Sequence, residues 1–92
     1  MKGCIVKPNR ESGDGRGDIF VMPVQFKKPA VILELKASKT AADMEEDSLK
    51  ALRQIDEKGY ADELGSMGYK NILKYGISFY RKNCVIATGN GA

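Results

Sequence analysis

The sequence predicts one small α/β domain, residues 1–92, built on a mixed β-sheet with a crossover helix. The hydrophobic pattern has the period of strands up to Lys36 and changes to the period of a helix between about Thr40 and Lys58. The strands before this change are joined by a connection too short for a helix, which predicts an antiparallel hairpin. The helix then leads to another strand, and such a crossover places its two strands parallel in one sheet.

Three strands are predicted before the helix. Residues 3–7 form a short first strand, and residues 18–26, rich in β-branched and aromatic side chains, form the second. Between them, residues 8–17 are rich in Pro, Asn, Ser, Gly and Asp, so we expect a loop. Residues 27–29 are the short hairpin connection. The third strand, residues 30–36, begins with a continuous apolar run typical of a central strand covered on both faces.

The predicted helix extends from about Thr40 to about Lys58. Thr40 or Asp43 can cap its first turn, and the acidic residues that follow favour the positive end of a helix. Gly59 is a plausible stop. Apolar residues recur at helical spacing over this segment, namely Met44, Ala51, Leu52 and Ile55.

Two further strands are predicted after the helix. Residues 60–68 suggest a short helical turn ended by glycines, and residues 71–81 alternate closely enough for a strand. A turn leads to a last strand that begins at Cys84. Residues 88–92 are predicted to be a frayed tail. The predicted order is therefore strand, strand, strand, helix, strand, strand.

The composition restricts the possible chemistry. The chain contains no histidine, which excludes Ser-His-Asp and Cys-His catalysis and zinc sites with histidine ligands. A net charge of +3 permits a nucleic-acid partner without requiring one. Neither a signal peptide nor a membrane-spanning apolar run is evident, so we expect a cytoplasmic protein without membrane contact.

Charged residues interrupt the third strand at Glu34 and Lys36. Side chains at positions i and i+2 of a strand share a face, so these two point the same way. In a hairpin that turns near residues 27–28, Asp18 pairs near positions 36–37 and can join them. Neighbouring carboxylates repel unless a cation lies between them. A solvent-exposed strand end with an ordinary ion pair is the competing interpretation.

A hard divalent cation is the alternative that we favour. Mg²⁺ binds carboxylate oxygens, backbone carbonyls and waters. Asp18 and Glu34 are the predicted carboxylate ligands, and the backbone carbonyl of Leu35 is a further candidate. Lys36, beside such a metal, can orient or deprotonate a water or balance charge on a phosphate. The set points to metal-assisted hydrolysis of phosphodiesters, with Mg²⁺ or Mn²⁺ as cofactor.

A family resemblance adds to this interpretation. It extends over residues 6–86 and is carried by the segments NRESGDGRGDI, AVILELK, ALRQIDEKGYADEL and GYKNILKYGISF. The chain resembles the PD-(D/E)xK nuclease superfamily, and within it the nuclease-like domain at the C-terminus of bacterial AAA-ATPase-like proteins. The resemblance implies a restriction-endonuclease-like core with Asp18, Glu34 and Lys36 as active-site residues. It also matches Gln54 to a glutamine that such nucleases place beside the site.

Three residues are candidates for contact with nucleic acid. Gln54 flanks the apolar stripe of the helix and can reach the end of the sheet, and the resemblance implies that Gln54 and Tyr60 face DNA. Arg16 can contact a phosphate through its planar guanidinium. The competing interpretations are a solvated helix flank for Gln54, a packing role for Tyr60 and an ordinary loop charge for Arg16.

The chain also departs from the family pattern. Gly17 stands where an aromatic or other side chain is usual, and the helix that usually begins the core is not evident in the sequence. One face of the sheet is then bare, which favours a homodimer. We expect a Mg²⁺-dependent DNA endonuclease. The alternative is a catalytically inactive module that serves dimerisation or nucleic-acid binding within a larger ATPase-containing protein.

Overall fold

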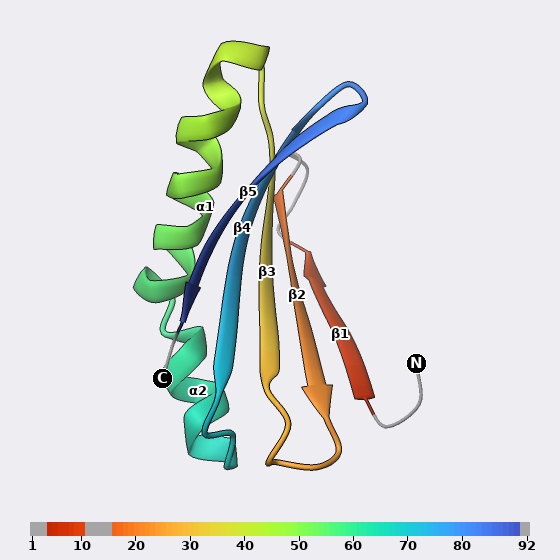
Figure 1. Cartoon of the computed structure of the whole chain (residues 1–92), viewed down its shortest axis with the longest axis vertical. Helices are drawn as coiled ribbons and strands as arrows, with labels where there is room; N and C mark the ends of the chain where they lie inside the picture. The colour runs from red at the N-terminus through yellow and green to blue at the C-terminus, as the bar shows by residue number, and fades with distance from the viewer. Residues whose placement is uncertain (1–3, 11–15, 91–92) are drawn as a thin grey trace.

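Five strands form one mixed sheet in the computed structural model, which describes residues 4–10 and 16–90. The strand order is β1-β2-β3-β4-β5, and only β3 and β4 pair in parallel. Both helices lie between β3 and β4 in the chain and on one side of the sheet in space (Figure 1). The predicted mixed sheet with a crossover helix is confirmed. The first element of the described residues is a strand, as expected.

The elements are β1 (Cys4–Arg10), β2 (Arg16–Pro23), β3 (Ala30–Ala37), a 3-10 turn (Ala41–Asp43), α1 (Met44–Glu57), α2 (Tyr60–Met67), β4 (Ile72–Tyr80) and β5 (Asn83–Asn90). No helix among these described segments is long and apolar enough to cross a membrane.

Two predicted segments are corrected at their edges. The loop predicted over 8–17 is strand at both ends, because residues 8–10 of β1 pair with residues 17–19 of β2. Pro8 is tolerated there because β1 pairs with a neighbour on one side only. The predicted tail over 88–92 is also too long, since β5 continues to Asn90 by pairing with β4. The rest of the predicted loop and tail, residues 11–15 and 91–92, lies outside the described residues.

The register of the β2–β3 hairpin is also corrected. Asp18 pairs with Glu34, and Arg16 pairs with Lys36, whereas the sequence suggested a partner for Asp18 at 36–37. The physical reason is the position of the turn. The Lys28 N–H donates to the Gln25 carbonyl, so the chain reverses over residues 25–28, earlier than assumed.

Helix α1 begins at Met44, after a 3-10 turn that occupies the predicted start near Thr40, and it ends close to the predicted Lys58. The Thr40 side chain accepts a hydrogen bond from the Asp43 N–H at 3.3 Å and caps the preceding 3-10 turn. Lys58 is the C-cap residue of α1, and Gly59 follows with φ of 70°, a conformation that favours glycine. The short helical turn expected over residues 60–68 is a full helix, α2 (Tyr60–Met67), with Gly68 as its C-cap.

The core lies between the helices and one face of the sheet. Its members are Phe20, Met22, Ala30, Ile32, Ile55, Leu64, Tyr69 and Ile72. Gly76 of β4 lets α1 lie directly on the sheet. A Cβ atom at this position would be 2.2 Å from the Ser48 carbonyl oxygen and 2.5 Å from the Leu52 nitrogen. The glycine therefore fixes how close the helix backbone comes to the strands.

The opposite face of the sheet, which we call the open face, is apolar. Strand alternation and register place on it Ile19, Val21, Leu33, Leu35, Tyr75, Ile77, Phe79 and Ile86. Phe79 is 39% exposed and Ile86 is 54% exposed. No described helix lies against this face (Figure 1).

Candidate active site

Two carboxylates lie opposite each other in the interior. Asp18 on β2 and Glu34 on β3 are register partners, and their exposed fractions are only 1% and 0%. Their side chains point to the helix-covered face because strand alternation places them on the same face as Phe20 and Ile32. A carboxylate in this environment is costly unless it is paired with a cation, a proton or hydrogen-bond donors.

Two side chains from the helical layer reach this pair. The Lys58 Nζ lies 3.5 Å from Asp18 Oδ2 and 3.4 Å from Glu34 Oε2. The Tyr60 hydroxyl donates a hydrogen bond to Asp18 Oδ2 at 2.5 Å, and its ring packs edge-on against Phe20. Lys58 and Tyr60 flank Gly59, so the link between α1 and α2 supplies both partners.

The electrostatic environment favours the neutral form of one carboxyl group. Burial raises the pKa of Glu34 from 4.5 to about 8, helped by a hydrogen bond to Asp18 and by the Asp18 charge, while Lys58 acts in the opposite direction. Burial and the hydrogen bond to Asp18 also raise the pKa of Tyr60 to about 12. Tyr60 therefore keeps its hydroxyl proton at neutral pH and donates it to Asp18. The raised pKa of Glu34 shows that burial beside Asp18 disfavours its charged form.

Three buried side-chain oxygens among the described residues have no hydrogen-bond donor. They are Asp18 Oδ1, Glu34 Oε1 and Gln54 Oε1. A cation held between the two carboxylates would satisfy this demand. No described cluster contains three His, Cys, Asp or Glu side chains, but two carboxylates with a carbonyl and waters suit Mg²⁺. The oxygen atoms and the adjacent Lys58 ammonium thus fit a cation site.

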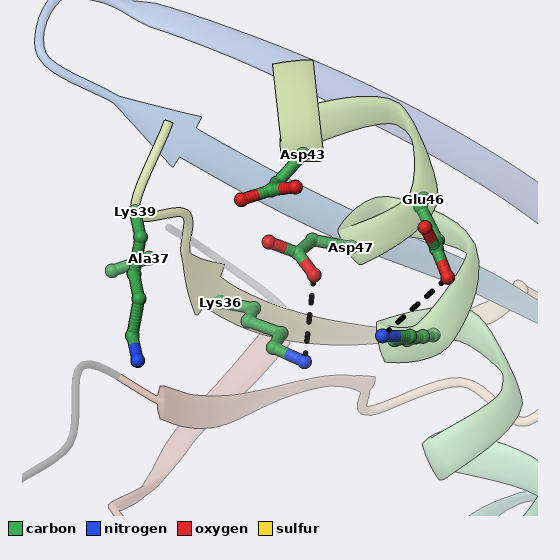
Figure 2. Close-up of a pocket in the computed structure, with 7 residues that line it drawn as sticks. Lys36, Ala37, Lys39, Asp43, Glu46 and Asp47 are labelled. Carbon is green, nitrogen blue, oxygen red and sulfur yellow. Dashed lines mark ion pairs between the residues drawn. The ribbon is translucent and has the colours of Figure 1, made fainter. Parts of the chain in front are cut away.

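Lys36 is directed away from the carboxylate pair. It shares the face of Glu34, but its Nζ lies 3.6 Å from Asp47 Oδ1 at the start of α1. Asp47 is itself held by a hydrogen bond of 2.7 Å from the Ser38 hydroxyl. Figure 2 shows Lys36 and Asp47 in a surface pocket of about 470 Å³ between β3 and α1. The other lining residues are Ala37, Lys39, Asp43, Glu46 and Lys50.

The remaining candidates from the sequence, Gln54, Arg16 and Leu35, lie on α1, β2 and β3. Gln54 is on α1, one turn before Lys58, whose N–H donates to the Gln54 carbonyl. Arg16 is the first residue of β2 and the register partner of Lys36. Leu35 pairs with Gly17 and Ile77, and its side chain faces the open face. A metal contact of the Leu35 carbonyl stays a prediction.

Sequence reasoning missed Lys58. A lysine on a charged helix resembles many solvated lysines, and only tertiary packing shows which one reaches a buried carboxylate. One signal was present: Lys58 follows the predicted site residue Gln54 by four positions, which places both on one side of the helix. It also stands two residues before Tyr60.

A comparison with known protein families gives one match. The family model described as the PD-(D/E)XK nuclease superfamily matches residues 1–89. No curated protein and no solved structure shows significant similarity to the chain.

Proposed function

The chain belongs to the PD-(D/E)XK nuclease superfamily, and from this premise we propose that it is a metal-dependent phosphodiesterase that cleaves DNA as an endonuclease. Nucleases of this superfamily generally use divalent metal ions. We propose Mg²⁺ or Mn²⁺ as the cofactor because the available ligands are hard oxygen atoms.

One observation carries the proposal. Asp18 and Glu34 are buried register partners, and each retains an oxygen without a donor. A purely structural ion pair would be expected to use its oxygens fully, since an unsatisfied buried acceptor costs about 1–3 kcal/mol. Burial that leaves carboxylate oxygens unsatisfied is typical of sites built to receive a ligand.

The proposed roles follow from chemistry and position. Asp18 and Glu34 hold the metal, with the Leu35 carbonyl as a further ligand. A bound divalent cation lowers the pKa of water and neutralises charge on the phosphate. Lys36 supplies a positive charge that can act on the water or on the phosphate. It can do so either from its present contact with Asp47 or after it leaves that contact. Gln54 is proposed as a further active-site residue beside the carboxylates.

Contact with DNA is proposed for Arg16, Gln54 and Tyr60. Arg16 begins β2, the strand that carries Asp18, and pairs with Lys36, so it lies two residues from Asp18 at the same end of the sheet. The Gln54 side-chain oxygen Oε1 is buried and has no hydrogen-bond donor, so it can accept a hydrogen bond from a substrate or a water. The Tyr60 hydroxyl donates to Asp18, so its proposed contact with DNA uses the ring edge or requires the hydroxyl to change partner.

The test compares the chain with Glu34→Gln in a plasmid-nicking assay with Mn²⁺ and with Mg²⁺. We expect the original chain to nick DNA, EDTA to abolish the activity, and the variant to lose on the order of 10²–10³ in rate. Metal affinity measured by calorimetry should lie between millimolar and micromolar and fall at least about tenfold in the variant. Affinity should rise from about pH 6 to about pH 8, because Glu34 must release its proton to the solvent.

Glu63→Gln is the matched control, because Glu63 is exposed on α2 and the substitution is the same. Equal metal affinity in the original chain and Glu34→Gln would refute the site. Metal binding without cleavage by the original chain would favour the inactive module, which binds nucleic acid or dimerises without hydrolysis. The pH effect concerns the whole cluster, since Asp18, Lys58 and Tyr60 all face Glu34.

We also propose a homodimer that buries the open face. Phe79 and Ile86 on this face are 39% and 54% exposed, and large exposed apolar side chains of this kind mark surfaces that a partner covers. We expect light scattering to give twice the chain mass and Ile86→Lys to return it to the monomer. A monomeric mass at high concentration would contradict the dimer.

A further inference from the structure

Lys58 occupies the position where a metal ion would compensate the two carboxylates. Its Nζ lies almost equally far from Asp18 Oδ2 and Glu34 Oε2, at 3.5 Å and 3.4 Å. The two carboxylate side chains are fully buried, while the Lys58 side chain keeps 26% of its exposure. The ammonium is thus held at the solvent side of the pair, and its Nζ lies over the Tyr60 ring, 5.7 Å from the ring centroid.

The chain gives Lys58 this position by its own architecture. Lys58 is the C-cap of α1, and the close approach of α1 to Gly76 places the end of the helix against β3. A lysine at a helix C-terminus also interacts favourably with the helix dipole. The ammonium is therefore a built-in cation for the site rather than a surface charge that happens to lie nearby.

An ammonium and a divalent cation cannot use the same oxygens without strong repulsion. Each carboxylate keeps one oxygen toward Lys58 and one without a donor, so the second set is available while Lys58 stays. A metal held by these oxygens would nevertheless lie close to the ammonium charge. The repulsion would favour release of Lys58 from its carboxylate contacts when the metal enters.

We propose that Lys58 is an intramolecular counter-ion that stabilises the carboxylate pair before metal binding and competes with the divalent cation for it. This inference rests on the proposed function, because it assumes that Asp18 and Glu34 are the metal ligands. The exposed fraction of Lys58 leaves its ammonium a path to solvent. Release of Lys58 would also place a positive charge at the edge of the site, where a phosphate could meet it.

The test is Lys58→Met, which removes the charge and keeps an unbranched apolar side chain. At one fixed pH, Mn²⁺ affinity measured by calorimetry should increase on the order of tenfold, since one ion pair no longer has to break. Without metal, the melting temperature of the variant should fall, and added Mn²⁺ should raise it by more than in the original chain.

Arg53→Met is the matched control, because Arg53 is exposed on the same helix and loses the same charge. Affinity that is unchanged, weaker, or increased only as much as in Arg53→Met would overturn the competition. The claim that Lys58 stabilises the carboxylate pair is tested separately, by thermal melting of a double-mutant cycle that combines Lys58→Met with Glu34→Gln. If the stability lost in the double variant equals the sum of the losses in the two single variants, the counter-ion role is overturned. If no protein binds metal, the proposed function fails, and the melting cycle still decides that role.

Discussion

Lys36→Ala is expected to keep the fold and the metal but to lose DNA cleavage by on the order of 10²–10³-fold. Lys36 is not a proposed ligand, so metal affinity should be unchanged or slightly higher once a nearby positive charge is gone. Its partly exposed ion pair with Asp47, at 3.6 Å, contributes at most about 1 kcal/mol to stability. The loss of rate would then report the action of the ammonium on the water or the phosphate.

Lys50→Ala is the control for this variant. Lys50 lines the same surface pocket and pairs with Glu46 on α1, but it takes no part in the proposed chemistry. Circular dichroism checks the fold of both variants, and calorimetry checks the metal. Undiminished nicking by Lys36→Ala would remove Lys36 from the mechanism. An equal loss in Lys50→Ala would assign the effect to general charge instead.

Gly76→Ala is expected to cost about 3 kcal/mol of stability or more, enough to endanger folding in a small domain. The added Cβ would meet the Ser48 carbonyl oxygen at 2.2 Å and the Leu52 nitrogen at 2.5 Å, and both atoms are backbone. Relief requires α1 to move away from β4. That movement would also withdraw Lys58 from the carboxylates, so the original site would be lost even in molecules that stay folded.

Gly65→Ala provides the comparison. Gly65 lies within α2, nothing lies within 4 Å of a Cβ built there, and its φ is not positive. Alanine is the better helix former by about 1 kcal/mol, so this variant should be as stable as the original chain or more stable. Urea denaturation of both variants measures the difference. A Gly76→Ala chain that unfolds at the original urea concentration would contradict the close helix packing.

Most of the fold could be predicted because strand alternation and helical spacing are local features of the sequence. The alternating residues of β2 and β4 and the helical spacing that leads to Ile55 are visible without tertiary information. The extent of β1 could not be predicted, because Pro8–Arg10 have turn-forming composition and become strand only through pairing with β2. The hairpin register depended on one turn, and an error there moved the predicted partner of Asp18 by two positions or more.

The candidate site also combines residues that the local sequence indicated with residues that only tertiary packing identifies. Asp18 and Glu34 could be recognised because charges inside an apolar strand are costly and therefore need a reason. Lys36 was assigned by its spacing from Glu34, but its contact with Asp47 depends on where α1 begins. Lys58 could not be found by local pattern, since its two partners lie on strands that are distant in the sequence. The role of Gly76 could not be predicted either, because the need for a residue without a side chain arises only where α1 packs against β4.

The crossover between β3 and β4 has a consequence for how the chain reaches its native state. The two carboxylates belong to one hairpin and can meet early, while Lys58 lies 24 residues beyond Glu34 and Tyr60 lies 42 residues beyond Asp18. Loop closure over such separations comes later than hairpin formation. The same docking step that excludes water from the carboxylates also delivers the ammonium and the hydroxyl. Burial of the two carboxyl groups and the arrival of Lys58 and Tyr60 are therefore coupled in one docking step, so we expect the carboxyl groups to lose water only when these partners reach them.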